Sequence, residues 1–130
     1  MSGRLISIAT AAISLLFGFA TLVVPAQFVS VFGVELTEEG LFGVRLAGVF
    51  ILGFSALDWY ARDDLEARGS GSARRAVISA NLVVGVLGFG VHLYAQLAGL
   101  LNELGWTSVV LFFVITIAWW YAALVARRAS

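Results

Sequence analysis

Residues 106–126 read WTSVVLFFVITIAWWYAALVA, a stretch without a single charged residue. A helix of about 20 mostly apolar residues crosses the hydrocarbon core of a bilayer. Three further stretches meet this requirement, at residues 5–24, 41–60 and 76–97. A membrane-spanning strand would alternate apolar and polar residues over about 10 positions, and the run from Val109 to Ala118 does not alternate. We therefore predict an all-α integral membrane protein, folded as an antiparallel four-helix bundle.

The composition agrees with a membrane protein and argues against several other classes. Of the 130 residues, 61% are hydrophobic and 12% are charged, and the mean hydropathy is +0.98. Soluble domains average about 45–50% apolar and about 25% charged residues. Because 8 basic residues are balanced by 8 acidic ones, no excess positive charge is available to bind nucleic acid. With no cysteine and only 1 histidine, we expect no disulfide, no thiolate chemistry and no metal site within one chain.

The connections between the predicted helices are short, so we expect a single transmembrane domain over residues 1–130. Pro25 closes the first span, because proline cannot continue a helix. Residues 26–36 remain rather apolar and suit a short amphipathic turn in the membrane interface, and Thr37 suits the N-cap of the second helix. The N-terminus also resembles a signal peptide, but its apolar stretch is longer than the usual h-region of about 7–15 residues.

The distribution of arginines predicts the orientation in the membrane. Cytoplasmic segments are enriched in Lys and Arg. Apart from Arg45, every arginine lies at the N-terminus, in or beside the central loop at residues 61–75, or at the C-terminus. We predict a multi-pass protein of the cytoplasmic membrane with both termini and the central loop in the cytoplasm. Aromatic residues are expected to mark the two interfaces, with Trp59, Tyr60, Trp119, Trp120 and Tyr121 inside and Tyr94 and Trp106 outside.

Small and polar residues recur at steps of three and four in two of the predicted helices, and residues at this spacing share one helix face. In lipid, small residues let helix backbones approach and polar residues hydrogen-bond between helices. We predict that these two stripes, on the first and third helices, face the bundle interior. A further small-residue surface is expected on the second helix. The fourth helix is bulkier, and we expect it to face lipid. The stripes are Ser7, Ala11, Ser14, Gly18, Thr21 and Pro25, and Asn81, Gly85, Gly88, His92, Gln96 and Gly99; the second-helix surface is Gly40, Gly43, Ala47 and Gly48; the bulky residues are Phe112, Phe113, Ile115 and Ile117.

Several short motifs occur in a recognisable order along the chain. Pro25-Ala26-Gln27-Phe28 and Phe32-Gly33-Val34 follow the first span, Arg45-Leu46-Ala47-Gly48 and Leu52-Gly53 lie in the second, and Gly105-Trp106 opens the fourth. This order resembles small bacterial four-helix membrane proteins of unknown function that are distantly DoxX-like. The resemblance implies the four-helix fold. DoxX-like proteins are linked to quinone-coupled redox chemistry in complexes, but the resemblance supplies no catalytic residues.

Arg45 lies about two turns into the second helix, where a charged group is normally paired or functional. One interpretation is an anion or headgroup contact, or a polar contact to a quinone-like carbonyl. The favoured interpretation is structural: a snorkelling side chain paired with Glu38, Glu103 or helix-end carbonyls.

His92, in the outer half of the third helix, has two interpretations of the same kind. It is either a ligand to a haem or chlorophyll metal or a proton carrier, or, as we favour, an imidazole hydrogen-bonded within its polar stripe. Arg45, His92, Tyr94 and Glu103 share one leaflet and form the candidate ligand pocket.

At the opposite, inner side, Asn81 is predicted to hydrogen-bond between helices, as are other polar residues of the stripes. Asp58 is predicted to be exposed, or paired with Arg62 one turn later.

Three functions remain open after this inventory. The favoured prediction is a non-enzymatic membrane protein without a cofactor, either free-standing or an accessory subunit of a larger membrane complex. The alternatives are a binder of a lipid, quinone or porphyrin through the Arg45/His92 pocket, and a small oligomeric transporter or channel. The expected partners are membrane lipids and either further copies of the chain or other membrane proteins, with no nucleic acid.

Overall fold

The computed structural model of this protein describes residues 2–65 and 72–128, and within these ranges the regular secondary structure is entirely helical. The helices are α1 (Gly3–Val23), α2 (Pro25–Ser30), α3 (Glu38–Ala61), α4 (Ser72–Leu97) and α5 (Gly105–Arg128). All except α2 are long and apolar enough to cross a membrane. The predicted all-α fold with four long apolar helices is confirmed, and each observed helix begins one to four residues before its predicted span and ends within two residues of the predicted end.

Local sequence explains where the helices begin and end. The Ser2 hydroxyl accepts a hydrogen bond from the Leu5 amide at 3.3 Å, which caps α1. Pro25 ends α1 and opens α2 at a position where its missing N–H is not needed. The Thr37 hydroxyl accepts from the Gly40 amide at 3.4 Å, so the predicted N-cap of α3 is confirmed.

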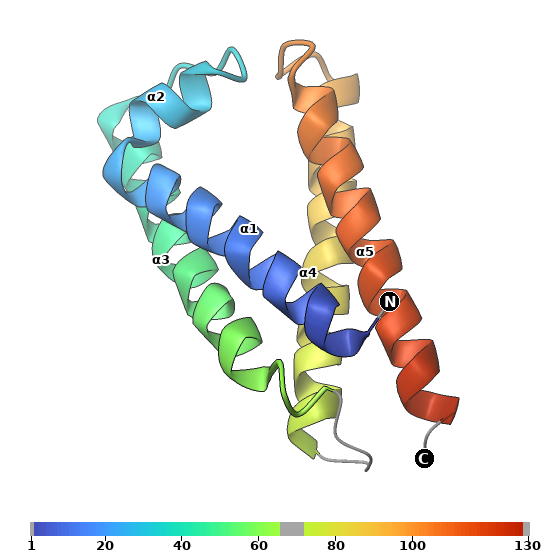
Figure 1. Cartoon of the computed structure of the whole chain (residues 1–130). Helices are drawn as coiled ribbons and strands as arrows, with labels where there is room; N and C mark the ends of the chain where they lie inside the picture. The colour runs from blue at the N-terminus through green and yellow to red at the C-terminus, as the bar shows by residue number, and fades with distance from the viewer. Residues whose placement is uncertain (1, 66–71, 129–130) are drawn as a thin grey trace.

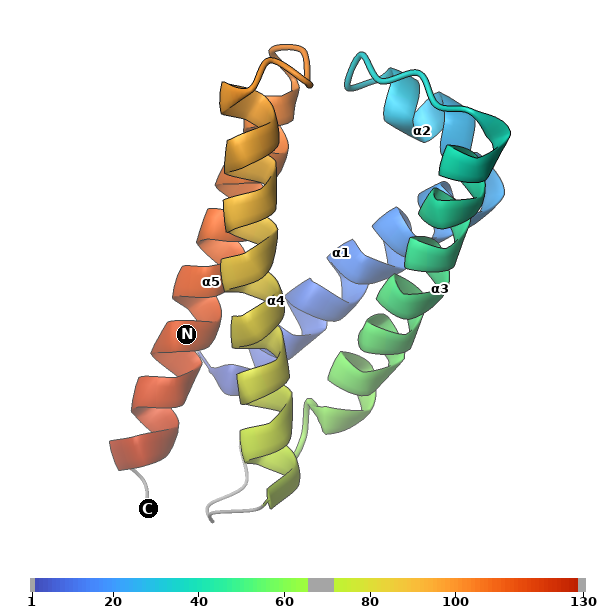
Figure 2. The same cartoon turned by 180° about the vertical axis from the view of Figure 1, so that it is seen from behind.

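The long helices form two antiparallel pairs. Most contacts between helices lie within the α1–α3 pair and within the α4–α5 pair, and few join one pair to the other. Figures 1 and 2 show the two pairs meeting near the end of the molecule that carries both termini and diverging toward the end that carries α2. The fold is therefore a four-helix arrangement that is tight at one end and open between the pairs at the other.

Close backbone contact holds the α1–α3 pair together. A Cβ atom added at Gly48 would lie 3.0 Å from both the Gly18 carbonyl oxygen and the Leu22 amide nitrogen, and one at Gly18 would lie 2.8 Å from Leu52 Cγ. The predicted α1 stripe faces this interior: most of it is buried, and Ser14 is half-buried. The buried members are Ser7, Ala11, Gly18, Thr21 and Pro25.

Only part of the small-residue surface predicted on the second helix is used for packing. Gly48 is buried and Gly40 is half-buried, but Gly43 and Ala47 are exposed, and a Cβ at Gly43 would meet nothing within 4 Å. Within this surface, the close approach to α1 occurs at Gly48.

The α4–α5 pair packs small residues against bulky ones. Gly85 lies against Thr116, and Gly88 lies directly against the Phe112 ring. The prediction that the fourth helix faces lipid is therefore only half right. Phe113 and Ile117 are exposed, but Phe112 and Ile115 are half-buried because the glycines of α4 make room for large side chains on one face of α5.

The apolar core lies at the end of the molecule that carries the termini. Trp119 is its largest member and is completely buried, and its indole N–H donates to the Thr10 hydroxyl at 3.1 Å. The prediction that Trp119 belongs to an interfacial belt is wrong, because the indole has both an apolar environment and a hydrogen-bond partner inside the protein. The other aromatic residues of the predicted belts are exposed. The remaining core members are Ile6, Ala61, Leu65, Val77, Ile78 and Ala122.

A matched pair of substitutions on α3 tests this packing. Gly48→Leu is expected to destabilise the protein by about 1–3 kcal/mol, because the added side chain meets backbone atoms of α1 that cannot move aside. Gly43→Leu adds the same side chain in open space and should not destabilise. The measurement is thermal unfolding in detergent, and equal destabilisation by both substitutions would contradict the described α1–α3 contact.

Candidate ligand cavity and buried polar contact

A cavity of about 300 Å³ lies between the two helix pairs, toward the α2 end. Every element of the chain contributes to its wall, which is almost entirely apolar. Its volume is at the lower end of the range of about 300–1,000 Å³ that is usual for small-molecule sites. The lining residues are Phe17, Phe28, Phe32 and Phe112, the aliphatic Val29, Val34, Val44, Ala47, Ile51 and Leu101, and the polar Thr21, His92 and Ser108.

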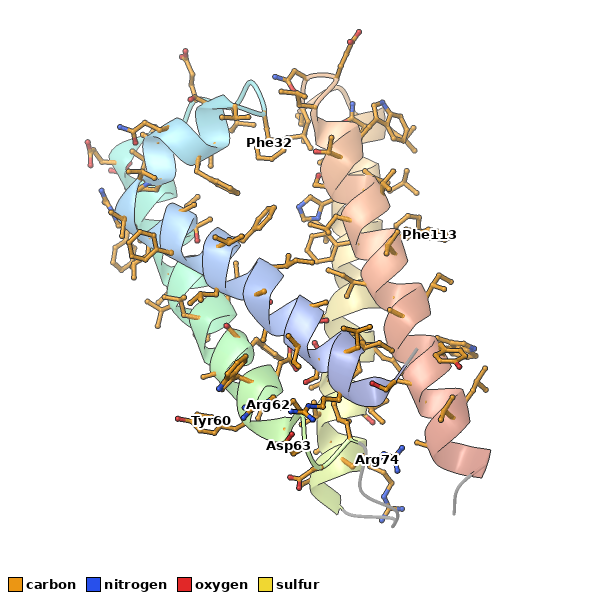
Figure 3. The ribbon with its side chains drawn as sticks, in the orientation of Figure 1. Phe32, Tyr60, Arg62, Asp63, Arg74 and Phe113 are labelled. Atoms are coloured by element: carbon orange, nitrogen blue, oxygen red, sulfur yellow. The ribbon has the colours of Figure 1, made fainter. Side chains whose placement is uncertain are left out.

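α2 and the loop after it cover the α2 end of the cavity. Phe28 packs edge-on against both Phe17 and Phe32, with ring centroids 5.5 Å and 5.6 Å apart. Figure 3 shows Phe32 between this loop and the α4–α5 turn. The predicted amphipathic turn at residues 26–36 is thus a short helix, α2, followed by a loop. We call this segment, with Phe28 and Phe32, the aromatic roof of the cavity.

Asn102 in the α4–α5 turn joins this roof to the other helix pair. Its amide N–H donates to the Phe32 carbonyl at 2.9 Å, and its side-chain Nδ2 donates to the Val31 carbonyl at 3.0 Å. Gly33 adopts a φ of 75°, and a Cβ there would lie 3.2 Å from Asn102 Cβ. Glycine therefore permits both the left-handed backbone and the close approach. Nothing in the sequence distinguishes Asn102 as a contact between the helix pairs, since a single loop asparagine carries no periodic signal.

His92 is the candidate residue that the structure places on the cavity. Its Nδ1 donates to the Gly88 carbonyl at 2.8 Å, and its ring stacks on Phe112 with centroids 4.5 Å apart. The hydrogen bond within the polar stripe is therefore present. Within the described residues no group of three metal-ligating side chains occurs, and the haem or chlorophyll interpretation of His92 stays a prediction.

The other members of the candidate pocket lie elsewhere. Arg45, Tyr94 and Glu103 are exposed and do not line the cavity. The ion pair predicted between Arg45 and Glu38 or Glu103 does not form in the described part of the chain. Arg45 is exposed on the apolar helix α3, so the interpretation of a snorkelling side chain stays a prediction.

The remaining polar and small candidates serve helix packing in different ways. Gly85 and Gly88 line the α4–α5 contact described above. Gln96 Nε2 donates to the Asn102 carbonyl at 3.2 Å, and Gly105 packs directly against the Gln96 side chain. Gln96 therefore supports the α4–α5 turn, rather than bonding across to the α1–α3 pair.

A second polar feature lies at the end that carries the termini, where Asp58 is completely buried. Its Oδ1 accepts a hydrogen bond from Asn81 Nδ2 at 2.7 Å, and its backbone carbonyl accepts one from the Ser7 hydroxyl at 2.5 Å. Asp58 Oδ2 has no hydrogen-bond partner among the described residues. This contact joins α1, α3 and α4, and the predicted interhelical role of Asn81 is present.

The prediction that Asp58 is exposed or paired with Arg62 is wrong. Arg62 instead lies 4.2 Å from the Trp59 ring, donates to the Trp59 carbonyl, and reaches Asp63 at 3.6 Å on the surface. Figure 3 shows Arg62 and Asp63 together at this end of α3. The spacing of Gly48, Ser55 and Asp58 along one helix face is the signal that could have placed Asp58 inside.

Comparisons with protein-family models, with curated proteins and with solved structures found no match to this chain. The DoxX-like resemblance therefore stays a prediction, and the site must be judged on its own geometry. That geometry includes the apolar cavity with its few polar groups and two buried hydrogen bonds between the helix pairs, Asn81 to Asp58 and Trp119 to Thr10.

The Asp58–Asn81 contact can be tested by a double-mutant cycle. Asn81→Leu should destabilise the protein by about 1–3 kcal/mol, because it leaves a buried acceptor of Asp58 without its donor. Asp58→Leu combined with Asn81→Leu should be less destabilising than the sum of the single changes, since replacing both partners removes the unsatisfied groups. Unfolding in detergent gives the four free energies, with Val83→Leu on the exposed side of α4 as control. Strict additivity would contradict a direct bond between the two side chains.

Proposed function

We propose that this chain is a non-enzymatic, four-span integral membrane protein that holds an apolar, lipid-like molecule in the cavity between its helix pairs. The single observation that carries the proposal is the cavity itself, which has an aromatic and aliphatic wall and only three polar side chains, Thr21, His92 and Ser108. Pre-formed apolar concavities with a few polar groups are typical of small-molecule sites.

The surface of the chain supports a membrane location. Large apolar side chains are exposed along every long helix, Leu16, Phe50, Leu87 and Phe113 among them. Figure 3 shows Phe113 on the outer side of α5. Soluble monomers rarely expose contiguous apolar patches of more than a few hundred Å². A bilayer solvates such a surface and also supplies apolar molecules that fit a cavity of this chemistry.

The position of the cavity changes which of the three functions predicted from the sequence is favoured. Binding through an Arg45/His92 pocket is replaced by binding in a cavity to which His92, but not Arg45, contributes. An accessory role in a larger complex is compatible with ligand binding, and proteins that co-purify in mild detergent would support it. Ion flux in liposomes is the corresponding test of an oligomeric transporter or channel.

A pair of substitutions on α3 tests ligand binding in the cavity. Ala47→Phe is expected to fill part of the cavity, because Ala47 lines it. Val49→Phe adds an aromatic ring two residues away on an exposed side chain outside the cavity lining. Lipids extracted from each purified protein and identified by mass spectrometry should include a species that is retained by wild type and Val49→Phe and lost from Ala47→Phe. Identical lipid content in all three proteins would contradict the proposal.

We further propose that both termini and the central loop face the cytoplasm, supported by the arginine distribution. Since the chain lacks cysteine, single substitutions report their position cleanly. Ser70→Cys should react with a membrane-impermeant maleimide only after the membrane is broken, whereas Glu103→Cys should react in intact cells. The opposite pattern of labelling would reverse the orientation.

A further inference from the structure

The polar side chains of the cavity wall can offer a bound molecule only the hydrogen-bond donors or acceptors that they do not already use within the protein. This inference rests on the proposed function, because it concerns the same cavity. The lining contains three polar side chains, Thr21, His92 and Ser108. Each of them donates a hydrogen to a backbone carbonyl of its own helix.

For the two hydroxyl groups the assignment follows from their single hydrogen. Thr21 Oγ1 lies 2.8 Å from the Phe17 carbonyl and 3.1 Å from that of Gly18, and Ser108 Oγ lies 2.7 Å from the Gly105 carbonyl. A carbonyl oxygen only accepts, so each hydroxyl is the donor in these bonds. Toward a bound molecule, each hydroxyl oxygen can therefore act only as a hydrogen-bond acceptor.

His92, like the two hydroxyl groups, has only a hydrogen-bond acceptor left for a bound molecule. Its Nδ1 lies 2.8 Å from the Gly88 carbonyl, which only accepts, so in the neutral form of the ring Nδ1 is the nitrogen that carries the hydrogen. The other nitrogen, Nε2, is then an acceptor, and it has no hydrogen-bond partner within the described residues. Stacking on Phe112 at 4.5 Å holds the imidazole plane in place.

We propose that the cavity selects an apolar, membrane-dissolved alcohol, whose hydroxyl donates a hydrogen bond to Nε2 of His92 while its hydrocarbon chain fills the aromatic and aliphatic wall. A molecule whose only polar group is a carbonyl or an ether presents an acceptor to side chains that have only acceptors left. It fills the same volume without gaining this bond. His92 therefore discriminates between ligands by their polar group and not by their hydrocarbon chain.

The test compares three probes of equal chain length on the full, detergent-solubilised chain: hexadecanol, the methyl ether of hexadecanol, and a straight-chain methyl ketone. Ligand affinity is obtained from the rise in unfolding temperature with ligand concentration. Hexadecanol should bind about three- to tenfold more tightly than the ether and the ketone, which is the fold-change that one additional net hydrogen bond supplies.

His92→Phe provides the matched variant, because phenylalanine can keep the stacking on Phe112 but offers no acceptor nitrogen. It should bind the alcohol and the ether equally and bind the ether as wild type does. The comparison of the three probes on the unmodified chain stands even where the variant does not fold.

Each outcome separates this inference from the proposed function. Equal binding of all three probes by the wild-type chain, abolished by Ala47→Phe, would overturn the selection of an alcohol but keep the cavity as a ligand site. Tighter binding of the ketone would also overturn it, by showing that the cavity offers a donor. Failure of every probe to bind, with unchanged lipid content in Ala47→Phe, would overturn the proposed function together with this inference.

Discussion

The hydrogen bonds that join the two helix pairs at one end of the molecule control the rest of the structure. Asn81 donates to the buried Asp58 carboxylate, and the Trp119 indole donates to Thr10. Inside a bilayer, apolar side chains gain little by contacting one another rather than lipid, so polar contacts and close packing must hold helices together. A buried carboxylate is costly unless it is hydrogen-bonded, so separating α3 from α4 would leave Asp58 without its donor.

Because these contacts are concentrated at one end, the helix pairs can diverge toward the other and leave the cavity between them. There the pairs are joined again, not by helix packing but by Asn102, which bonds to the backbone of Val31 and Phe32. The cavity therefore lies between a buried polar contact and an aromatic roof. Its wall is apolar because helices in lipid can leave apolar side chains facing an internal space as well as the bilayer.

The polar groups of this wall show how a helix backbone determines the hydrogen-bonding capacity of the side chains it carries. Thr21, His92 and Ser108 all donate to carbonyls within their own helices. Such bonds are usual for hydroxyl groups in helices, which reach back to the preceding turn. At this site the bonds have a further effect, because each of the three side chains uses its donor within its own helix and retains only acceptor capacity. A small set of local bonds thereby gives an apolar cavity a definite polarity.

The number and approximate bounds of the long helices, the Thr37 cap and most of the buried face of α1 could be predicted from the sequence, because hydrophobic runs, caps and helical periodicity are local properties of the chain. The burial of Asp58 and Trp119, and the absence of Arg45 from the cavity that His92 lines, could not be predicted, because they depend on how the helices pack. A polar or aromatic residue near a helix end is suited both to the membrane interface and to an interior with a partner. The partners of Asp58 and Trp119, Asn81 and Thr10, lie on other helices, and their positions depend on how the two pairs meet.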